Sequence, residues 1–295
     1  MNNKSIYELQ NEDEILKCLV RQRELYGISE QWGMVKFIFT IILIPLFSIF
    51  KNNIIMFKLY VVLVLSIPLI NSFINNMSNK LKNRAAEIQQ YIDVKLYSTV
   101  TNENLKKWGK LLGKTEISKE ISKIDKKKIE KEKVKNWYSD YSKKEAILQI
   151  FYSQKENISW NLEQIKNYKI LCNIALYGVY IILILIAIFI NNLLDENFLK
   201  LILWIPSFLN YLHSIVNNLN DDIQKIEIIN KMSRIIEEEL IEIKNYDKLI
   251  DLEIDLQNKI FELRKKIYKI PNWFYKINHI KNQEREDNVA KNINQ

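Results

Sequence analysis

The chain has 295 residues and a net charge of +8, and it contains only five glycines and four prolines. That is too little turn-forming punctuation for a strand-rich protein, so long helices are expected. The positive charge is concentrated in residues 75–169, which hold 21 Lys and Arg against 12 Asp and Glu. Cys18 and Cys172 fit no metal or disulfide spacing, which favours a reducing compartment. The first thirty residues are too polar for a cleavable signal peptide.

Four apolar runs dominate the hydropathy pattern, and they comprise residues 34–50, 54–74, 170–190 and 198–216. A helix that crosses the hydrocarbon core of a bilayer needs roughly 20 mainly apolar residues, with about 17 to 25 tolerated. Each run is therefore long enough to span a membrane. Because only short connectors separate the first run from the second and the third from the fourth, the pattern predicts two transmembrane hairpins. The alternative is a set of buried core helices in a soluble protein.

Basic residues indicate the orientation of these hairpins. Lys80, Lys82 and Arg84 follow the second run, and Lys166 and Lys169 precede the third. Lysine and arginine near span ends favour the cytoplasmic side, so the middle segment and both termini are expected in the cytoplasm. The predicted parts are a cytoplasmic N-terminal helix (1–33), a first transmembrane hairpin (34–74), a cytoplasmic helical segment (75–169), a second transmembrane hairpin (170–216) and a cytoplasmic C-terminal helical region (217–295).

Apolar residues at spacings of three and four continue beyond the membrane runs. One stripe extends from Ile74 to Leu96, and another from Ile229 to Ile267, before Pro271. Such stripes are typical of helices that pack along one face. We therefore expect an all-α membrane protein with four transmembrane helices in two hairpins and long cytoplasmic helical stalks. The stalks would pack together or against other subunits as a coiled coil.

Two prolines, Pro68 and Pro206, fall inside the second and fourth runs. A proline within a helix removes a backbone donor and kinks or loosens the helix. Both are therefore candidate membrane hinges that open a path. The alternative is that they only shape helix packing.

Polar and aromatic residues gather in the middle segment shortly before the third run, and the candidate site comprises Trp137, Tyr138, Gln154, Lys155, Asn157 and Trp160. Amide side chains offer both donors and acceptors, and a tryptophan ring offers a stacking surface. A nucleotide base requires both features, and a lysine can neutralise a phosphate. The pattern is thus a candidate nucleotide site. The alternative is a helix–helix contact with a tryptophan anchored near the membrane.

Motifs for catalysis are missing from the sequence. It has two histidines, His213 in the fourth run and His279 in the tail, and no G-x-S-x-G, Walker, H-E-x-x-H or paired-cysteine motif. We expect no enzyme activity, no metal and no cofactor. The pattern is consistent with a ligand-gated membrane protein. The alternatives are a ligand-independent membrane scaffold built on coiled-coil stalks and a constitutive channel.

Four short motifs are arranged in order around the two predicted hairpins: RQREL at 21–25, Trp-Tyr-Ser at 137–139, QKEN followed by Trp at 154–160, and Ile-Pro-Asn-Trp-Phe-Tyr at 270–275. In this order they resemble the SMODS-associating four-transmembrane effector family of bacterial CBASS antiphage systems. The likeness covers nearly the whole chain.

The resemblance implies a multi-pass effector of the bacterial inner membrane, with residues 75–169 as its sensor segment. It implies activation by a cyclic oligonucleotide from a partner nucleotidyltransferase, rather than by DNA or RNA. The active protein would be a pore-forming or membrane-disrupting homo-oligomer in the lipid bilayer. Growth arrest or death of the infected cell would follow.

Overall fold

The computed structural model describes residues 4–43, 53–109, 111–189, 205–242 and 246–295, and this described part contains helices and no strand. A π-helix (Ile38–Leu43) continues α2, and a 3-10 helix (Leu105–Trp108) follows α4. The all-α class predicted from the sequence is confirmed. The α-helices are α1 (Ile6–Leu9), α2 (Asp13–Phe37), α4 (Ile54–Thr101), α5 (Lys114–Ile121), α6 (Lys126–Glu132), α7 (Ala146–Phe189), α9 (Ile205–Glu242), α10 (Tyr246–Lys266) and α11 (Asn272–Asn294).

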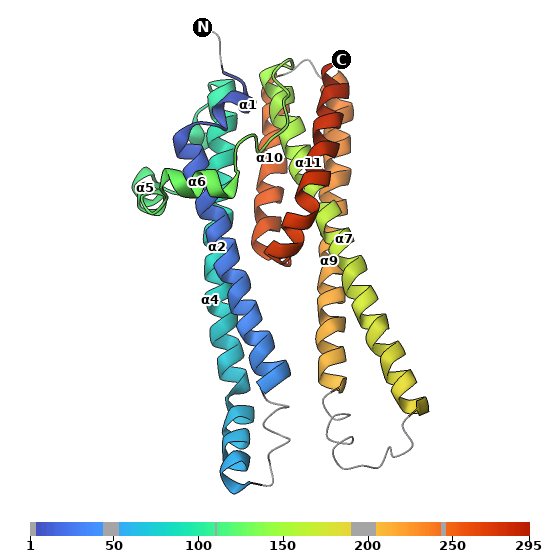
Figure 1. Cartoon of the computed structure of the whole chain (residues 1–295). Helices are drawn as coiled ribbons and strands as arrows, with labels where there is room; N and C mark the ends of the chain where they lie inside the picture. Colours follow the sequence, from blue (N-terminus) through green and yellow to red (C-terminus); the bar gives the residue numbers. More distant parts are fainter. Residues whose placement is uncertain (1–3, 44–52, 110, 190–204, 243–245) are drawn as a thin grey trace.

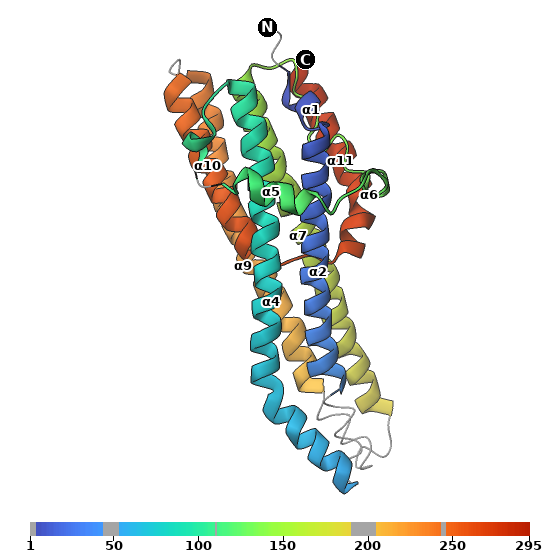
Figure 2. The ribbon, with the colours of Figure 1, turned by 90° about the vertical axis from the view of Figure 1, so that its left-hand side faces the viewer.

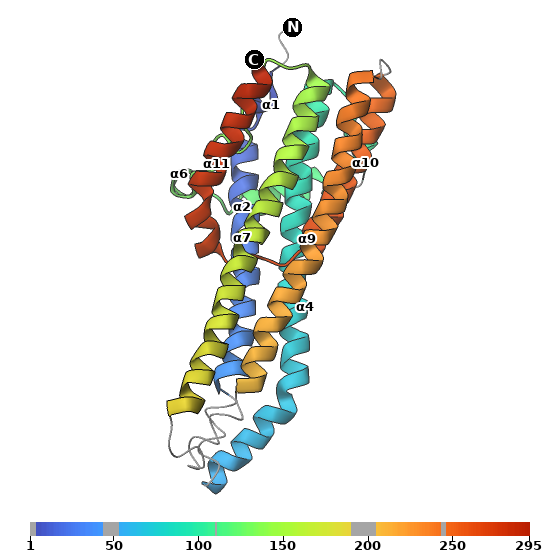
Figure 3. The same ribbon diagram turned by 90° about the vertical axis from the view of Figure 1, so that its right-hand side faces the viewer.

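Two pairs of long helices form the body of the molecule, α2 with α4 and α7 with α9 (Figure 1). Both described chain ends lie at one end of this body, together with the short helices α1, α5 and α6. The helices α10 and α11 lie at opposite edges of that same end (Figures 2 and 3). The elongated bundle therefore has a broad end, built from many elements, and a narrow end, built from the long helices.

The narrow end exposes apolar side chains. They come from the first half of α4 and the last half of α7. Both helices, over Ile54–Thr101 and Ala146–Ile186, are long and apolar enough to cross a membrane. Apolar patches of this extent mark contact with a membrane or a partner rather than water. The exposed residues include Leu65, Leu69 and Phe73 of α4, and Ile174, Ile181 and Ile188 of α7.

The second and third apolar runs therefore lie on helices suited to a bilayer, by length and composition. Residues 44–50 of the first run and 198–204 of the fourth lie outside the described residues. The arrangement of four spans in two hairpins stays a prediction.

The broad end has a closely packed interior. The helices α2 and α4 share one apolar core with the middle segment, and α7, α9 and α10 share a second. The stripe residues Ile229, Ile236 and Ile260 are buried in the second core. Packing within a single chain therefore accounts for these parts of the stalk pattern. Association of the stalks with other subunits stays a prediction.

The two candidate hinge prolines differ in their surroundings. Pro68 lies inside α4, and the first turns of α4 are inclined to the rest of that helix (Figure 2). A proline within a helix is an ordinary cause of such a bend. Pro206 is the second residue of the described part of α9, and the residues before Ile205 lie outside the described ranges. Hinge motion at either proline stays a prediction.

Candidate functional site

A cavity of about 930 Å³ lies in the broad end, between α2, α7, α11 and the segment 131–138. Ligand pockets for small molecules are about 300 to 1,000 Å³, so this cavity can hold a ligand of several rings. Among the described residues that line it, nine are lysine or arginine and five are aspartate or glutamate. The cavity is therefore suited to an anion.

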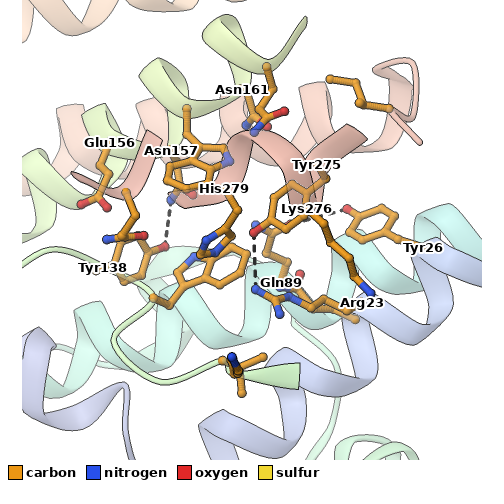
Figure 4. A pocket seen from close by; sticks show the side chains of 18 of the residues that line it. Arg23, Tyr26, Gln89, Tyr138, Glu156, Asn157, Asn161, Tyr275, Lys276 and His279 are labelled. Carbon is orange, nitrogen blue, oxygen red and sulfur yellow. Dashed lines mark hydrogen bonds between the residues drawn. The ribbon is translucent and has the colours of Figure 1, made fainter. Parts of the chain in front are cut away.

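Helical periodicity brings the wall residues together. Asn157, Trp160 and Gln164 follow one another at spacings of three and four along α7, and all three line the cavity. Residues at these spacings share one side of a helix. Tyr275 and His279 repeat this spacing on α11, and both point into the same space (Figure 4). Two helices that are far apart in sequence, α7 and α11, thus each contribute one face.

Two aromatic rings lie against the guanidinium of Arg23, next to the segment 131–138. The Arg23 guanidinium carbon lies 5.2 Å from the ring centroid of Trp137 and 5.7 Å from that of Tyr275. Its Nη1 donates to the backbone carbonyl of Glu132 at 2.6 Å. The two cation–π contacts and this hydrogen bond hold Arg23 in place. A flat ring and a fixed cation are the two partners that a nucleotide base and its phosphate require.

A second aromatic group adjoins the first through Tyr275. The ring centroids of Trp160 and His279 are 5.4 Å apart, and those of Tyr275 and His279 are 5.3 Å apart. Burial lowers the pKa of His279, and the nearby Arg23 lowers it further. The imidazole is therefore neutral at pH 7 and can stack on a base without repelling the surrounding cations.

A buried polar network forms the floor beside Tyr138. The Tyr138 hydroxyl donates to Asp93 Oδ1 at 2.6 Å. It accepts from Asn157 Nδ2 at 2.8 Å (Figure 4). Arg264 Nη1 contacts Asp93 Oδ2 at 2.6 Å, and Gln257 Nε2 donates to the same oxygen at 3.0 Å. Burial raises the pKa of Tyr138 well above its usual range. These hydrogen bonds hold the Tyr138 side chain in place, so Tyr138 has a structural role in lining the cavity.

Lysine side chains add positive charge that the protein does not fully neutralise. Lys269 lines the cavity with its Nζ 3.6 Å from the ring centroid of Tyr26. The pKa of Lys269 is lowered to about 8, mainly by burial; the attraction of Glu30 opposes the shift, and the positive charges of Arg23 and Lys82 add to it. A bound anion would stabilise the charged form of this lysine.

The structure brings together four of the six site residues proposed from the sequence: Trp137, Tyr138, Asn157 and Trp160 all line the cavity. The other two lie elsewhere on α7. Gln154 is buried against α10, where its Nε2 donates to the carbonyl of Glu253 at 2.9 Å. Lys155 pairs with Glu237 of α9 at 2.6 Å.

The physical reason is the rotation of 100° per residue in an α-helix. A spacing of three leaves successive side chains about 60° apart around the axis, so residues 154 and 160 differ by about 120°. Lys155 is about 160° from Asn157 around the axis, so it lies on the opposite side of α7. Gln154 is only about 60° from Asn157, and its contact with Glu253 of α10 keeps it out of the cavity.

Sequence reasoning left out several cavity residues, namely Arg23, Tyr26, Lys269, Tyr275, Lys276 and His279. A signal was present for some of them, because Arg23 belongs to the RQREL motif and Tyr275 to the motif at 270–275. Arg21 of the first motif has a different role: its Nε donates to Glu120 at 2.7 Å and ties α2 to α5.

The fold and the cavity define a class of protein: a helical chain with two helices long and apolar enough to cross a membrane, whose broad end encloses a cavity lined by cationic and aromatic side chains. The SMODS-associating 4TM effector domain matches residues 4–293. The chain belongs to this family. It is 25% identical over 235 residues to a protein of Bacillus cereus (strain VD146) described as a probable CBASS effector molecule. The aligned residues cover 75% of this chain and 76% of that relative. No solved structure matches the chain.

Proposed function

We propose that this protein is a membrane effector of bacterial antiphage defence that is activated by a cyclic oligonucleotide. The ligand occupies the cavity, and the active protein then permeabilises or disrupts the inner membrane, so that growth of the infected cell stops. The observation that carries the proposal is the cavity itself, in which aromatic rings and fixed cations face one another. Family membership and the relative's description support the same conclusion.

The chemistry of the cavity favours a nucleotide over other anions. Base stacking on an aromatic side chain contributes about 1 to 3 kcal/mol per base, and Trp137, Trp160 and Tyr275 all line the site. Arg23 supplies a planar cation, which suits a phosphate oxygen pair better than an ammonium does. A small inorganic anion would leave the rings unused, and an apolar ligand would leave the cations unpaired.

The cavity joins both halves of the chain, which offers a route from ligand to membrane. Arg23 is on α2, which reaches the first apolar run at residue 34 and continues into the π-helix at Ile38–Leu43. Trp160 is on α7, which continues without a break through the third run to Phe189. A ligand that contacts both helices favours one relative placement of them, by its differential affinity for the two states.

The wider setting belongs to the same proposal. The ligand comes from a partner nucleotidyltransferase, and both termini face the cytoplasm because the basic residues flank the middle segment. The protein acts as a homo-oligomer, and it acts without catalysing a reaction.

A liposome assay tests the proposal. Protein reconstituted into vesicles that hold a self-quenched dye is mixed with a panel of cyclic di- and trinucleotides. Leakage should require both the protein and a cyclic nucleotide. Trp137→Ala should weaken binding by roughly ten- to a hundredfold, because a stacked ring is lost, and should leave the helical circular dichroism unchanged.

Trp273→Ala is the matched control, because Trp273 is 53% exposed and does not line the cavity. This variant should bind the cyclic nucleotide and cause dye leakage to the same extent as the unaltered protein. Leakage that is equally fast without any cyclic nucleotide would favour a constitutive channel. Binding without leakage in any lipid mixture would favour a scaffold.

A further inference from the structure

The segment 267–272, which leads from α10 into α11, is attached to both pairs of long helices, and we call it the strap. Residues 267–271 have no regular secondary structure. The strap crosses from the edge of α10 to the edge of α11 where the broad end adjoins the narrow end (Figures 2 and 3). Most of its residues line the cavity, namely Ile267, Tyr268, Lys269, Ile270 and Asn272.

On one side the strap is attached to α7 and α9. The backbone N of Tyr268 donates to Asp222 Oδ2 of α9 at 2.5 Å, and Asp222 is only 3% exposed. The ring of Tyr268 stacks with that of Tyr168 on α7, with centroids 6.3 Å apart and an angle of 18° between the planes. Because a hydrogen bond to a buried carboxylate is stronger than one between neutral groups, these contacts fix the strap to the second helix pair.

On the other side the strap is attached to α2. The backbone N of Asn272 donates to Glu30 Oε2 at 2.9 Å, and Lys269 lies over the ring of Tyr26. In the described part of the chain α2 makes little direct contact with α7 or α9, and the cavity lies between α2 and α7. The strap is therefore a link between α2 and the α7–α9 pair.

Lys269 is the part of the strap that can respond to an anion. Its ammonium group faces an aromatic ring, and the charges that act on it are the cations Arg23 and Lys82 and the acid Glu30. A phosphate attracts an ammonium group more strongly than the face of a ring does. An anion in the cavity therefore competes with Tyr26 for Lys269.

We infer that the strap holds α2 and the α7–α9 pair in a closed arrangement, and that a phosphate of the bound nucleotide opens this arrangement by drawing Lys269 away from Tyr26. Both α2 and α7 continue toward the narrow end, so their separation is transmitted to the membrane segments. This inference rests on the proposed function and names the element that couples its site to the bilayer.

Two variants that detach the strap test the closed arrangement in vesicles loaded with a self-quenched dye. Asp222→Ala removes the acceptor of Tyr268 N, and Glu30→Ala removes that of Asn272 N. Without any nucleotide, each variant should release dye faster than the unaltered protein by about five- to 150-fold, the shift expected when one buried hydrogen bond no longer favours the closed state. Glu30 is half-buried, so the second variant disturbs the interior less than the first.

Glu237→Ala is the matched control on α9. It removes the same charge as Asp222→Ala, but Glu237 pairs with Lys155 of α7 at 2.6 Å, which is a contact within one helix pair. This variant should release no more dye without nucleotide than the unaltered protein does.

Lys269→Met should have the opposite effect. Methionine keeps an unbranched apolar chain against Tyr26 and offers a phosphate no charge, so the strap stays closed. At a saturating concentration of the cyclic di- or trinucleotide that releases most dye with the unaltered protein, Lys269→Met should release less than about a tenth as much. Calorimetry on the same samples verifies that this nucleotide is bound.

The outcomes separate the inference from the proposed function. If no cyclic nucleotide releases dye with the unaltered protein, the proposed function fails. If one does, but Asp222→Ala and Glu30→Ala both stay closed without it, only the inference fails. Normal release by nucleotide-bound Lys269→Met also overturns the inference. Equal release by Glu237→Ala and Asp222→Ala without nucleotide would assign the leakage to a general loss of stability, with the same consequence.

Discussion

A buried carboxyl at the edge of the cavity makes the stability of this protein depend on pH. Glu156 on α7 is 5% exposed, and its carboxyl group accepts a hydrogen bond from Ser139 N at 3.1 Å and lies 3.2 Å from Ser139 Oγ. Asp287 of α11 accepts from the same hydroxyl at 3.0 Å. The pKa of Glu156 is raised to about 8, mainly by burial and also by the charges of Glu286 and Asp287, while the hydrogen bonds from Ser139 oppose the shift.

The sign of the effect follows from proton binding. Between the ordinary carboxyl pKa of 4.5 and the raised pKa of about 8, the folded protein keeps a proton that the unfolded chain has lost. The free energy of unfolding therefore decreases as pH rises through this window, by about 1.4 kcal/mol per pH unit. Over the whole window the contribution of Glu156 reaches roughly 5 kcal/mol at most.

Glu156→Gln keeps the shape and hydrogen-bonding capacity of the neutral acid and cannot ionise. Near pH 5 the variant should match the unaltered protein, and at pH 8 it should be more stable by several kcal/mol. Denaturant unfolding in detergent, followed by circular dichroism at a series of pH values, gives the two profiles. Burial also raises the pKa of Glu253, so the difference between the profiles is the quantity to examine.

Glu163→Gln is the control for this experiment, because Glu163 is a half-exposed carboxyl on the same helix that pairs with Arg285 at 3.2 Å. Its profile should keep the slope of the unaltered protein. Parallel profiles for Glu156→Gln and the unaltered protein between pH 5 and 8 would refute the reasoning.

Three further predictions concern the network, the cavity charge and the topology. Asp93→Asn leaves the buried Arg264 without its anionic partner and should lower the free energy of unfolding by about 3 to 5 kcal/mol; a loss below about 1 kcal/mol in denaturant unfolding would contradict this. An anion favours the charged form of Lys269, whose pKa burial has lowered to about 8, so calorimetric affinity for a cyclic nucleotide should fall as pH rises through 8. Lys269→Met should remove that pH dependence, and an unchanged pH profile in this variant would exclude Lys269. In intact cells an impermeant thiol reagent should label Asn192→Cys and spare Lys127→Cys; labelling of Lys127→Cys would reverse the proposed orientation.

Local periodicity in the sequence was enough to predict most of the helices. The apolar run that begins at Ile54 passes into the stripe that ends near Leu96, and the structure has one continuous helix there, α4. Likewise Ala146–Phe189 forms a single helix that carries both the polar site residues and the third run. These features follow from spacings of three and four residues along one segment, which a single chain displays without reference to any other segment.

The composition of the site was only partly visible in the sequence. Aromatic and amide residues in the middle segment indicated a stacking site, and Trp137, Asn157 and Trp160 do line the cavity. Gln154 belongs to the same stretch of sequence and contacts α10 instead, whereas Gln164, ten residues later, lines the cavity. Residue type and spacing identified the helix, but they did not identify which side of it faces the site.

Only the tertiary structure decided which helical faces meet. Arg23 and Tyr275 are 252 residues apart in sequence, yet Arg23 Nη2 lies 3.4 Å from the Tyr275 hydroxyl, because α11 returns after Pro271 to pack along α7. No local sequence feature predicts how α11 packs, because the side that α11 buries depends on the surfaces of α2 and α7. Helical periodicity is a property of neighbouring residues, whereas a cavity is what remains when distant faces pack, so the first can be read along the chain and the second requires the fold.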